Sequence, residues 1–377
     1  MMVLSGQFHS GSFVRRARHA AITALAAVMV PAFIGATFAP AAAQTGGDAL
    51  RQLVAAAAKE GELNVFGSGD WNSPQLMAAL EKGLNKTYGI NVRLKTTPGP
   101  SASKLMPRII DEAKTGRAAS TDIFFAPSRQ TIPSDQAGAL LRVDWKKLMP
   151  GLRDEEVGIN GAAVVIGASI HIIGYNTNLV KARDLPKSYK DFTNPRYKGK
   201  IGTTVFAVGW VEAAIHLGEE EATRIVDAMV ANGAIIGATR TGVQNRVATG
   251  EFPIFAFDTK PVAYARLKAK GGPVDYATMD DFMSGTASEV SVPKTSANPN
   301  LAKLLSVYML TKQGQDTIWR VIGRDSPFRD GSQLNKLVES KRAAGAKIYF
   351  GTDQNVVKNA YFYRKVSRKL AKKLRGN

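Results

Sequence analysis

Short apolar runs alternate with amphipathic stretches in the first third of the chain after residue 46. Residues 63–66 and 90–94 are apolar runs typical of buried strands. Residues 74–86 carry apolar side chains at helical spacing, with Ser73 in the capping position and Pro74 in the first turn. The same pattern predicts helices at 46–61 and 101–115 and a third strand at 121–125. Strands separated by helices of this length pair in parallel, so an α/β lobe is predicted here.

The pattern changes in the middle of the chain. Residues 162–175, AAVVIGASIHIIGY, form a β-branched apolar stretch that is too long for one ordinary strand, and we expect it to cross between two lobes. A second α/β lobe is predicted from strands at 200–206, 234–237 and 253–257 and from helices at 211–232 and 242–249. Residues 286–292 are expected to cross back, and helices are expected from 301–311 to the end. The predicted division is residues 44–170 plus 287–377 for lobe 1 and 171–286 for lobe 2.

The N-terminus has the pattern of an export signal. Arg15, Arg16 and Arg18 precede an apolar run at 20–30, and the small residues at 40–43 offer a cleavage site. A membrane anchor is the alternative, but the stretch is rich in Ala and is interrupted by proline and glycine. We therefore predict a signal peptide at 1–43 and a mature protein in the periplasm. The pattern leaves the Sec and twin-arginine routes both open.

Charge and composition narrow the classes of function. The chain has no Cys, which excludes thiol nucleophiles and disulfides, and its formal net charge is +19. Residues 358–377 contain eight Lys or Arg and no acid, with an apolar stripe at helical spacing. Such a helix could bind a membrane or nucleic acid, but the export signal argues against nucleic acid, and we expect the stripe to pack on the body of the protein.

Recognisable catalytic motifs are absent from the sequence. The predicted mature chain contains only His171 and His216, both expected to be structural, and it lacks nucleophile-elbow, Walker A, zinc-protease and dinucleotide-binding motifs. We predict no cofactor and no catalytic residue. An enzyme that uses two carboxylates distant in sequence stays open as the alternative.

Polar loops at the predicted strand ends are the best candidates for a site. In open α/β sheets, ligands bind beyond the carboxyl ends of the strands, where helix N-termini expose free amides. Arg129 and Arg240 are the candidate ligands for a carboxylate or phosphate, and Trp71, Phe206 and Trp210 are candidate walls. A surface ion pair is the alternative for Arg129, and core packing is the alternative for each of the three aromatic residues. The predicted ligand-binding residues are Ser68, Trp71, Ser128, Arg129, Thr204, Phe206, Trp210, Arg240 and Asp258.

Five segments in order resemble a known family. They are LVAAAAKEGELNVFGSG, HIIGYNTNLV, DLPKSYKDFTNPRYKGKIG, VATGEFPIFAF and SVPKTSANPNLAKLLSVYMLTKQGQDTI. Together they resemble the extracellular solute-binding proteins of ABC transporters, in the branch that contains iron(III), thiamine, polyamine and phosphonate binders. The resemblance implies a type II periplasmic-binding-protein fold, in which two α/β lobes joined by two crossing strands close on a ligand. It also implies a monomer that serves an ABC transporter membrane permease.

One position departs from the ferric members of that family. They carry a tandem Tyr pair where this sequence has Phe257, Asp258, Thr259 and Lys260, and the next Tyr is Tyr264. Without the two phenolates a bare ferric ion is not expected, and no metal site is predicted. The sequence thus predicts a periplasmic binding protein that captures a small polar, anionic solute between its lobes. A periplasmic enzyme and a sensory or scaffold protein are the competing functions, and the ligand and permease stay unidentified.

Overall fold

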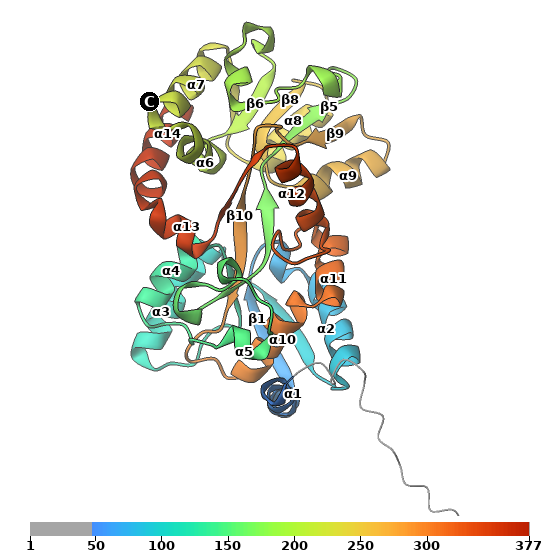
Figure 1. Ribbon diagram of the computed structural model, residues 1–377, viewed down its shortest axis with the longest axis vertical. Helices are drawn as coiled ribbons and strands as arrows, with labels where there is room; N and C mark the ends of the chain where they lie inside the picture. The colour runs from blue at the N-terminus through green and yellow to red at the C-terminus, as the bar shows by residue number, and fades with distance from the viewer. Residues whose placement is uncertain (1–46, 377) are drawn as a thin grey trace, which may run out of the picture. The chain divides into compact units, whose positions relative to one another are not determined.

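The computed structural model describes residues 47–376, and the predicted signal peptide lies outside the described residues (Figure 1). The first part of the described chain forms the start of lobe 1. Its elements are α1 (Asp48–Glu60), β1 (Glu62–Gly67), α2 (Pro74–Tyr88), β2 (Arg93–Pro98), α3 (Ala102–Thr115), β3 (Phe124–Ala126), α4 (Ser128–Gln136) and α5 (Trp145–Leu148). The short turn η2 (Asp70–Asn72) follows β1.

Local signals fix α2 where the sequence predicted it, whereas α4 and α5 were not predicted and β2 begins three residues later than expected. The Ser73 hydroxyl accepts a hydrogen bond from the Leu76 amide at the start of α2, and Gly89 ends that helix in the left-handed conformation. Strands β1 and β2 pair in parallel from Glu62 opposite Arg93 onward. The predicted parallel pairing is therefore confirmed for β1 and β2, whereas β3 belongs to a different sheet and pairs antiparallel with residues 289–291.

The crossing segment consists of two strands that belong to different sheets. They are β4 (Val164–Ile170) and β5 (Ile172–Asn176), and His171 lies between them. β4 pairs antiparallel with the long strand β10 (Phe282–Ser291), which runs from one lobe to the other in Figure 1. His171 is buried, with Nδ1 2.8 Å from a Glu212 carboxylate oxygen and 3.1 Å from the Ser284 hydroxyl. The segment formed by β4 and β5 is the first of the two predicted crossings, and β10 is the second.

Lobe 2 has a five-stranded mixed sheet in the order β7-β6-β8-β5-β9. Its remaining strands are β6 (Ile201–Thr204), β7 (Ile235–Gly237), β8 (Ile254–Asp258) and β9 (Val274–Ala277), and its helices are α6 (Val208–Leu217), α7 (Glu219–Ala231), α8 (Arg240–Ala248) and α9 (Pro261–Ala269). The single helix predicted at 211–232 is wrong, because Gly218 adopts a φ of 93° and separates α6 from α7. Strand β9 was not predicted.

The C-terminal third returns to both lobes. It contains α10 (Pro299–Leu310), α11 (Lys312–Ile322), α12 (Gln333–Ala343), β11 (Lys347–Gly351), α13 (Asp353–Lys358), the π-helical turn η8 (Phe362–Val366) and α14 (Ser367–Leu374). Strand β11 pairs in parallel with the first half of β10, and it interrupts the all-helical ending that the sequence predicted. No helix within residues 47–376 is long and apolar enough to cross a membrane.

Two large hydrophobic clusters make the cores. One joins α1, α2 and α10 in lobe 1, and the other gathers Trp210, Ile225 and Phe257 in lobe 2. Leu370 and Leu374 of α14 belong to the second cluster, although residues 287–377 were predicted to lie with lobe 1. The apolar stripe of the C-terminal helix does pack on the protein, but it does so against α6 and α7. We call residues 353–374 the C-terminal arm, and the lobe limits given above stay a proposal.

Candidate functional site

A pocket of about 330 Å³ lies where the loops of lobe 1 meet the crossing strands and one residue of lobe 2. We call it the interlobe pocket. Its walls are residues 68–71 after β1, Ala102, residues 125–127 at the end of β3, Ser169 of β4, residues 286–288 of β10, Lys260 after β8, and Arg324 after α11. The volume lies near the lower end of the range of about 300–1,000 Å³ that is usual for small-molecule sites.

Trp71 forms an aromatic wall of this pocket. Its ring stacks on Phe125 with centroids 6.0 Å apart and planes 12° from parallel. Only 8% of Trp71 is exposed, so most of the indole packs into lobe 1 and the remainder faces the pocket. The two rings give the pocket an apolar surface beside its charged groups.

Arg324 is held against the first crossing strand. The segment after α11 accepts a hydrogen bond from β4, because the Ala168 amide donates to the Asp325 carbonyl at 3.1 Å. A Cβ atom on Gly167 would lie 2.0 Å from the Arg324 carbonyl oxygen and 3.0 Å from the Trp71 ring, so this close approach requires glycine. The Arg324 guanidinium lies 3.1 Å from the Asp70 carboxylate, and its side chain is 16% exposed. The charge is thus fixed at the pocket wall.

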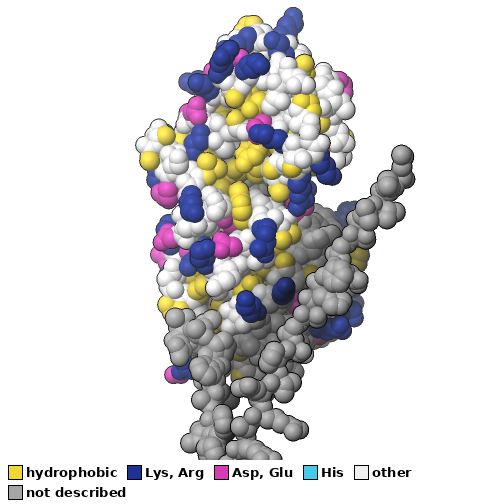
Figure 2. All heavy atoms as spheres, turned by 90° about the vertical axis from the view of Figure 1, so that its right-hand side faces the viewer, with side chains coloured by type: hydrophobic (Ala, Val, Ile, Leu, Met, Phe, Trp, Pro, Cys, Tyr) yellow, Lys and Arg dark blue, Asp and Glu magenta, His cyan; other side chains and the backbone are white. Residues whose placement is uncertain are grey.

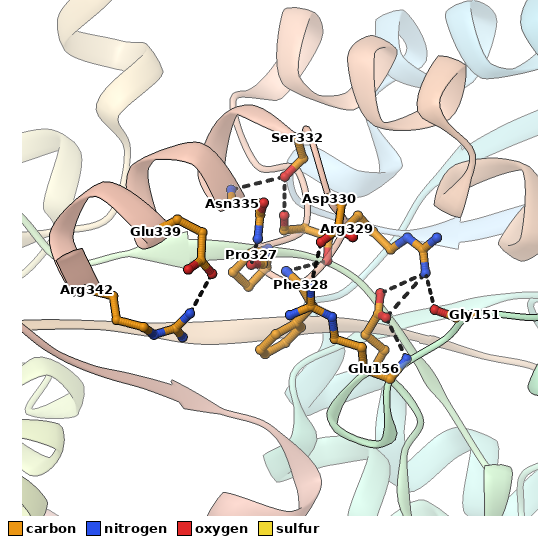
Figure 3. Close-up of polar contacts among 12 residues, drawn as sticks. Gly151, Glu156, Pro327, Phe328, Arg329, Asp330, Ser332, Asn335, Glu339 and Arg342 are labelled. Carbon is orange, nitrogen blue, oxygen red and sulfur yellow. Dashed lines mark hydrogen bonds and ion pairs between the residues drawn. The ribbon is translucent and has the colours of Figure 1, made fainter.

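The residues after Arg324 are anchored on lobe 1 (Figure 3). The Arg329 guanidinium lies 3.3 Å from the buried Glu156 carboxylate and donates to the Gly151 carbonyl at 3.4 Å. Ser332 caps α12 by accepting from the Asn335 amide, and the Asn335 side chain donates to the Pro327 carbonyl. Burial raises the pKa of Glu156, and Arg329 opposes that rise. This network fixes the loop that carries Arg324.

Lobe 2 contributes Lys260 through a bulge at the end of β8. The register of β5 and β8 shifts beside Phe257, whose φ of 64° is unusual for a residue other than glycine. The bulge directs Lys260 toward lobe 1, where its ammonium lies 3.4 Å from the Asp70 carboxylate. Asp258 is fully buried and accepts from the Gln244 side chain at 2.5 Å and from the Thr259 amide at 2.6 Å. Backbone strain of this kind tends to occur at functional sites.

Positive charge is in excess around the pocket. Arg240 begins α8, and its Nε is buried without a hydrogen-bond partner among the described residues. Burial lowers the pKa of Arg240, Asp258 opposes the shift, and the charges of Arg324 and Arg129 lower the pKa further. Burial likewise lowers the pKa of Arg324, against the effects of Asp70 and Asp258. We call Arg129, Arg240, Lys260 and Arg324 the cation group; only the carboxylates Asp70 and Asp258 oppose it in these interactions.

The structure brings some of the predicted site residues to this place. Ser68 and Trp71 line the interlobe pocket, and Arg240 lies within electrostatic reach of Arg324. Asp258 acts on both arginines but has its two oxygens occupied by protein donors. Arg129 is exposed and lines a different hollow, although its charge reaches Arg240. Their role as ligand-binding residues stays a proposal.

The other predicted residues lie elsewhere. Ser128 is buried, and its hydroxyl lies 2.5 Å from a Glu289 carboxylate oxygen and 3.0 Å from the Gly351 carbonyl oxygen, so it faces inward. Trp210 is 1% exposed and packs edge-on to Phe257 at 4.5 Å in the core of lobe 2. Thr204 is buried at the end of β6, and Phe206 is 55% exposed outside the lining of the interlobe pocket. Core packing, the alternative for the aromatic residues, describes Trp210.

Sequence reasoning missed three charged residues of the pocket. Asp70 and Lys260 lie in loops that the sequence analysis identified as candidates. A charged residue beside hydroxyl residues in each loop was the signal that could have pointed to them. Arg324 lies in a stretch without any motif, more than fifty residues from the other pocket loops in sequence. Among residues 47–376, no group of three or more His, Asp or Glu could hold a metal ion.

Comparison with known proteins assigns this architecture. The family profile described as bacterial extracellular solute-binding protein matches residues 136–349. HitA from Pseudomonas aeruginosa, solved with iron bound, is 21% identical, with a TM-score of 0.64 over 82% of this chain and 99% of HitA. The substrate-binding protein of an ABC transporter from Agrobacterium tumefaciens is 17% identical, with a TM-score of 0.65 over 83% of this chain and 94% of that protein. A Trichodesmium protein, IdiA or FutA, solved with iron and citrate, is 18% identical, with a TM-score of 0.63 over 84% of this chain and 99% of that protein.

These likenesses concern the fold. At such identities they confirm the predicted type II periplasmic-binding-protein fold with its two α/β lobes. No curated protein sequence matches the chain.

Proposed function

Starting from the fact that this chain belongs to the bacterial extracellular solute-binding protein family, we propose that it captures a small anionic solute in the interlobe pocket and delivers it to an ABC importer. Binding in this fold is an equilibrium between open and closed lobes that a ligand shifts by its differential affinity. Lys260 and Asp70 belong to opposite lobes and lie 3.4 Å apart. A ligand held by both lobes would favour the closed state.

The convergence of Arg324 and Lys260 on one carboxylate carries the proposal. Asp70 is within 3.4 Å of both cations, so the pocket wall has more positive than negative charge. An anion would relieve this imbalance, and a planar carboxylate or phosphonate suits the forked donors of an arginine. The stacked Trp71 and Phe125 rings favour a solute that also has an apolar part.

The same charges argue against a bare metal ion. HitA holds iron, but here the only carboxylate that lines the pocket within residues 47–376 is already paired with two cations. A cation placed there would meet Arg324 and Lys260 at short range without enough oxygen ligands. The proposed cargo is therefore an organic anion.

The proposed cell location and partner follow from membership of the solute-binding protein family. The predicted signal peptide at 1–43 would export the chain, and the mature protein would act in the periplasm beside the membrane permease. Lys and Arg side chains are scattered over the face seen in Figure 2, with hydrophobic atoms gathered in its middle. Such a distributed positive charge favours the approach of anionic solutes more than it defines their fit.

Arg324→Gln tests the site directly. We expect the mature protein to bind one or more members of a panel of small carboxylates, sulfonates and phosphonates in calorimetry. Loss of the charged donor should weaken that binding about tenfold or more. Arg320→Gln is the matched control, because Arg320 is exposed on α11 one turn before the pocket.

Two results would contradict the proposal. Equal affinities of the Arg324→Gln and Arg320→Gln proteins would remove the interlobe pocket from ligand binding. Recovery of a chemically altered solute after incubation with the protein would favour catalysis over capture, and mass spectrometry of the solute distinguishes the two.

A further inference from the structure

A second hollow lies between α4 and the C-terminal arm, which are neighbours on one side of the molecule (Figure 1). We call it the arm groove. Its volume is about 320 Å³, comparable to that of the interlobe pocket. Ile132 and Pro133 of α4 face Val356 and Val357 of α13 across it, with Arg129 and Arg364 also in the lining. The walls are thus apolar, with one guanidinium from α4 and one from η8 of the C-terminal arm.

The two helices present continuous faces to the groove. Arg129, Ile132 and Pro133 follow the spacing of one face of α4, and Val356, Ala360 and Arg364 repeat at four-residue intervals along the arm. Val357 is 48% exposed, which is unusual for a valine on a helix that has a packing partner. The facing apolar stripes therefore leave space between them instead of closing on each other.

The charges in the groove have no protein partner. The side chains of Arg129 and Arg364 are exposed and make no hydrogen bond or ion pair with any residue from 47 to 376. Elsewhere on the arm, Lys369 and Lys373 pair with Glu219 and Asp227 of α7. These pairs hold the arm on lobe 2, whereas the arginines remain available on its other side.

No acid lines the arm groove within the described residues. Burial raises the pKa of Tyr363, so this phenol stays neutral and its hydroxyl lies 3.3 Å from that of Tyr349. A bound molecule would meet two positive charges, a neutral phenol and an apolar floor. Charge complementarity then requires a negative group, and the floor favours a hydrocarbon body.

We propose that the arm groove is a second binding site, distinct from the interlobe pocket, for a small monoanion with an apolar body such as a medium-chain carboxylate. The carboxylate would lie between Arg129 and Arg364, and the hydrocarbon would cover Val356 and Val357. Because both guanidiniums are exposed, each contributes modestly and its effect is screened by salt. The affinity should therefore be weak and should decrease with ionic strength.

Octanoate is the probe that tests this site. Titration of octanoate into the full mature protein at low salt should give saturable heat, and octanol, which lacks the charge, should bind at least about fivefold more weakly. Arg364→Ala should weaken octanoate binding about fivefold. Ala360→Phe should block the groove and abolish that binding.

Matched variants separate the two sites. Arg368→Ala removes an exposed arginine of the same arm outside the groove and should leave octanoate binding unchanged. Arg324→Gln changes the interlobe pocket and should likewise leave it unchanged. The inference is overturned if octanoate fails to bind, if Arg364→Ala and Arg368→Ala bind it equally, or if Arg324→Gln alone removes binding.

Discussion

Gly167→Ala is the sharpest test of how the crossing strand positions the ligand site. The added Cβ would lie 2.0 Å from the Arg324 carbonyl oxygen, 3.1 Å from its carbonyl carbon and 3.0 Å from the Trp71 ring. Side-chain carbon atoms do not approach backbone oxygen so closely, so the loop that carries Arg324 must retreat by about 1 Å. One methyl group therefore acts on two walls of the interlobe pocket at once.

The expected cost follows from this displacement. Overpacking of a buried contact costs about 1–3 kcal/mol, which corresponds to a fall in melting temperature of about 1–4 °C in a chain of this size. A retreat of about 1 Å would also break the charged contact of Arg324 with Asp70, now 3.1 Å long, and move the guanidinium away from a bound anion. We expect about tenfold weaker binding of the anion that binds the unmodified protein best in the panel.

Differential scanning calorimetry and titration calorimetry measure the two effects. Gly47→Ala is the control, because a Cβ on Gly47 meets no atom within 4 Å. If Gly167→Ala matches this control in melting temperature, the packing of Arg324 on β4 is incorrect. A fall in melting temperature with unchanged affinity would instead show that Arg324 does not contact the ligand.

Three further predictions concern stability, each measured by denaturant unfolding. Burial raises the pKa of Asp325 from 3.8 to about 6, so the folded state binds the proton more tightly than the unfolded state does. Stability should therefore fall by up to about 3 kcal/mol as the pH rises from about 4 to about 6. Asp325→Asn should remove this pH dependence, and an unchanged profile would refute the prediction. Leu370→Ala should cost about 2–5 kcal/mol because Leu370 is fully buried in lobe 2, whereas exposed Lys372→Ala should cost little; equal costs would mean that the arm is not packed. Trp210→Ala should cost about 3–5 kcal/mol of stability because the indole lies in the core, and it should leave the anion affinity of the folded protein unchanged. A selective loss of affinity would show that Trp210 contributes to the ligand site.

Elements with local signals could be predicted well from the sequence. The α2 helix begins at Pro74 as its cap and proline indicated, and β1 and α3 lie within a residue or two of the predicted ranges. Capping and apolar period depend on residues close in sequence, so a single chain reveals them. Where a local signal was overlooked, as with the glycine that separates α6 from α7, the prediction failed.

Elements that depend on distant pairing were not predicted. Strand β11 exists because residues 347–351 add to the edge of β10, and no alternation in its own sequence signals this partner. The C-terminal arm shows the same limit, since its apolar stripe indicated packing but not the lobe. Strand and helix partners separated by many residues are chosen by the packing of the whole chain.

The candidate site divides in the same way. Loop chemistry singled out Ser68, Trp71 and Arg240 and the segments that contain Asp70 and Lys260, because polar groups after strands are a local feature. Arg324 could not be found, since its place depends on Gly167 admitting the backbone of a segment far along the chain.

The sequence by itself determined the two α/β lobes, the crossing strands and the family, because these are written in local periodicity and in ordered segments. Only the tertiary structure decided which charges meet in the interlobe pocket, that Trp210 belongs to the core, and that the arm packs on lobe 2. The physical reason is that electrostatic and packing energies depend on distances between side chains, which fall off within a few ångströms in space whatever the separation along the chain.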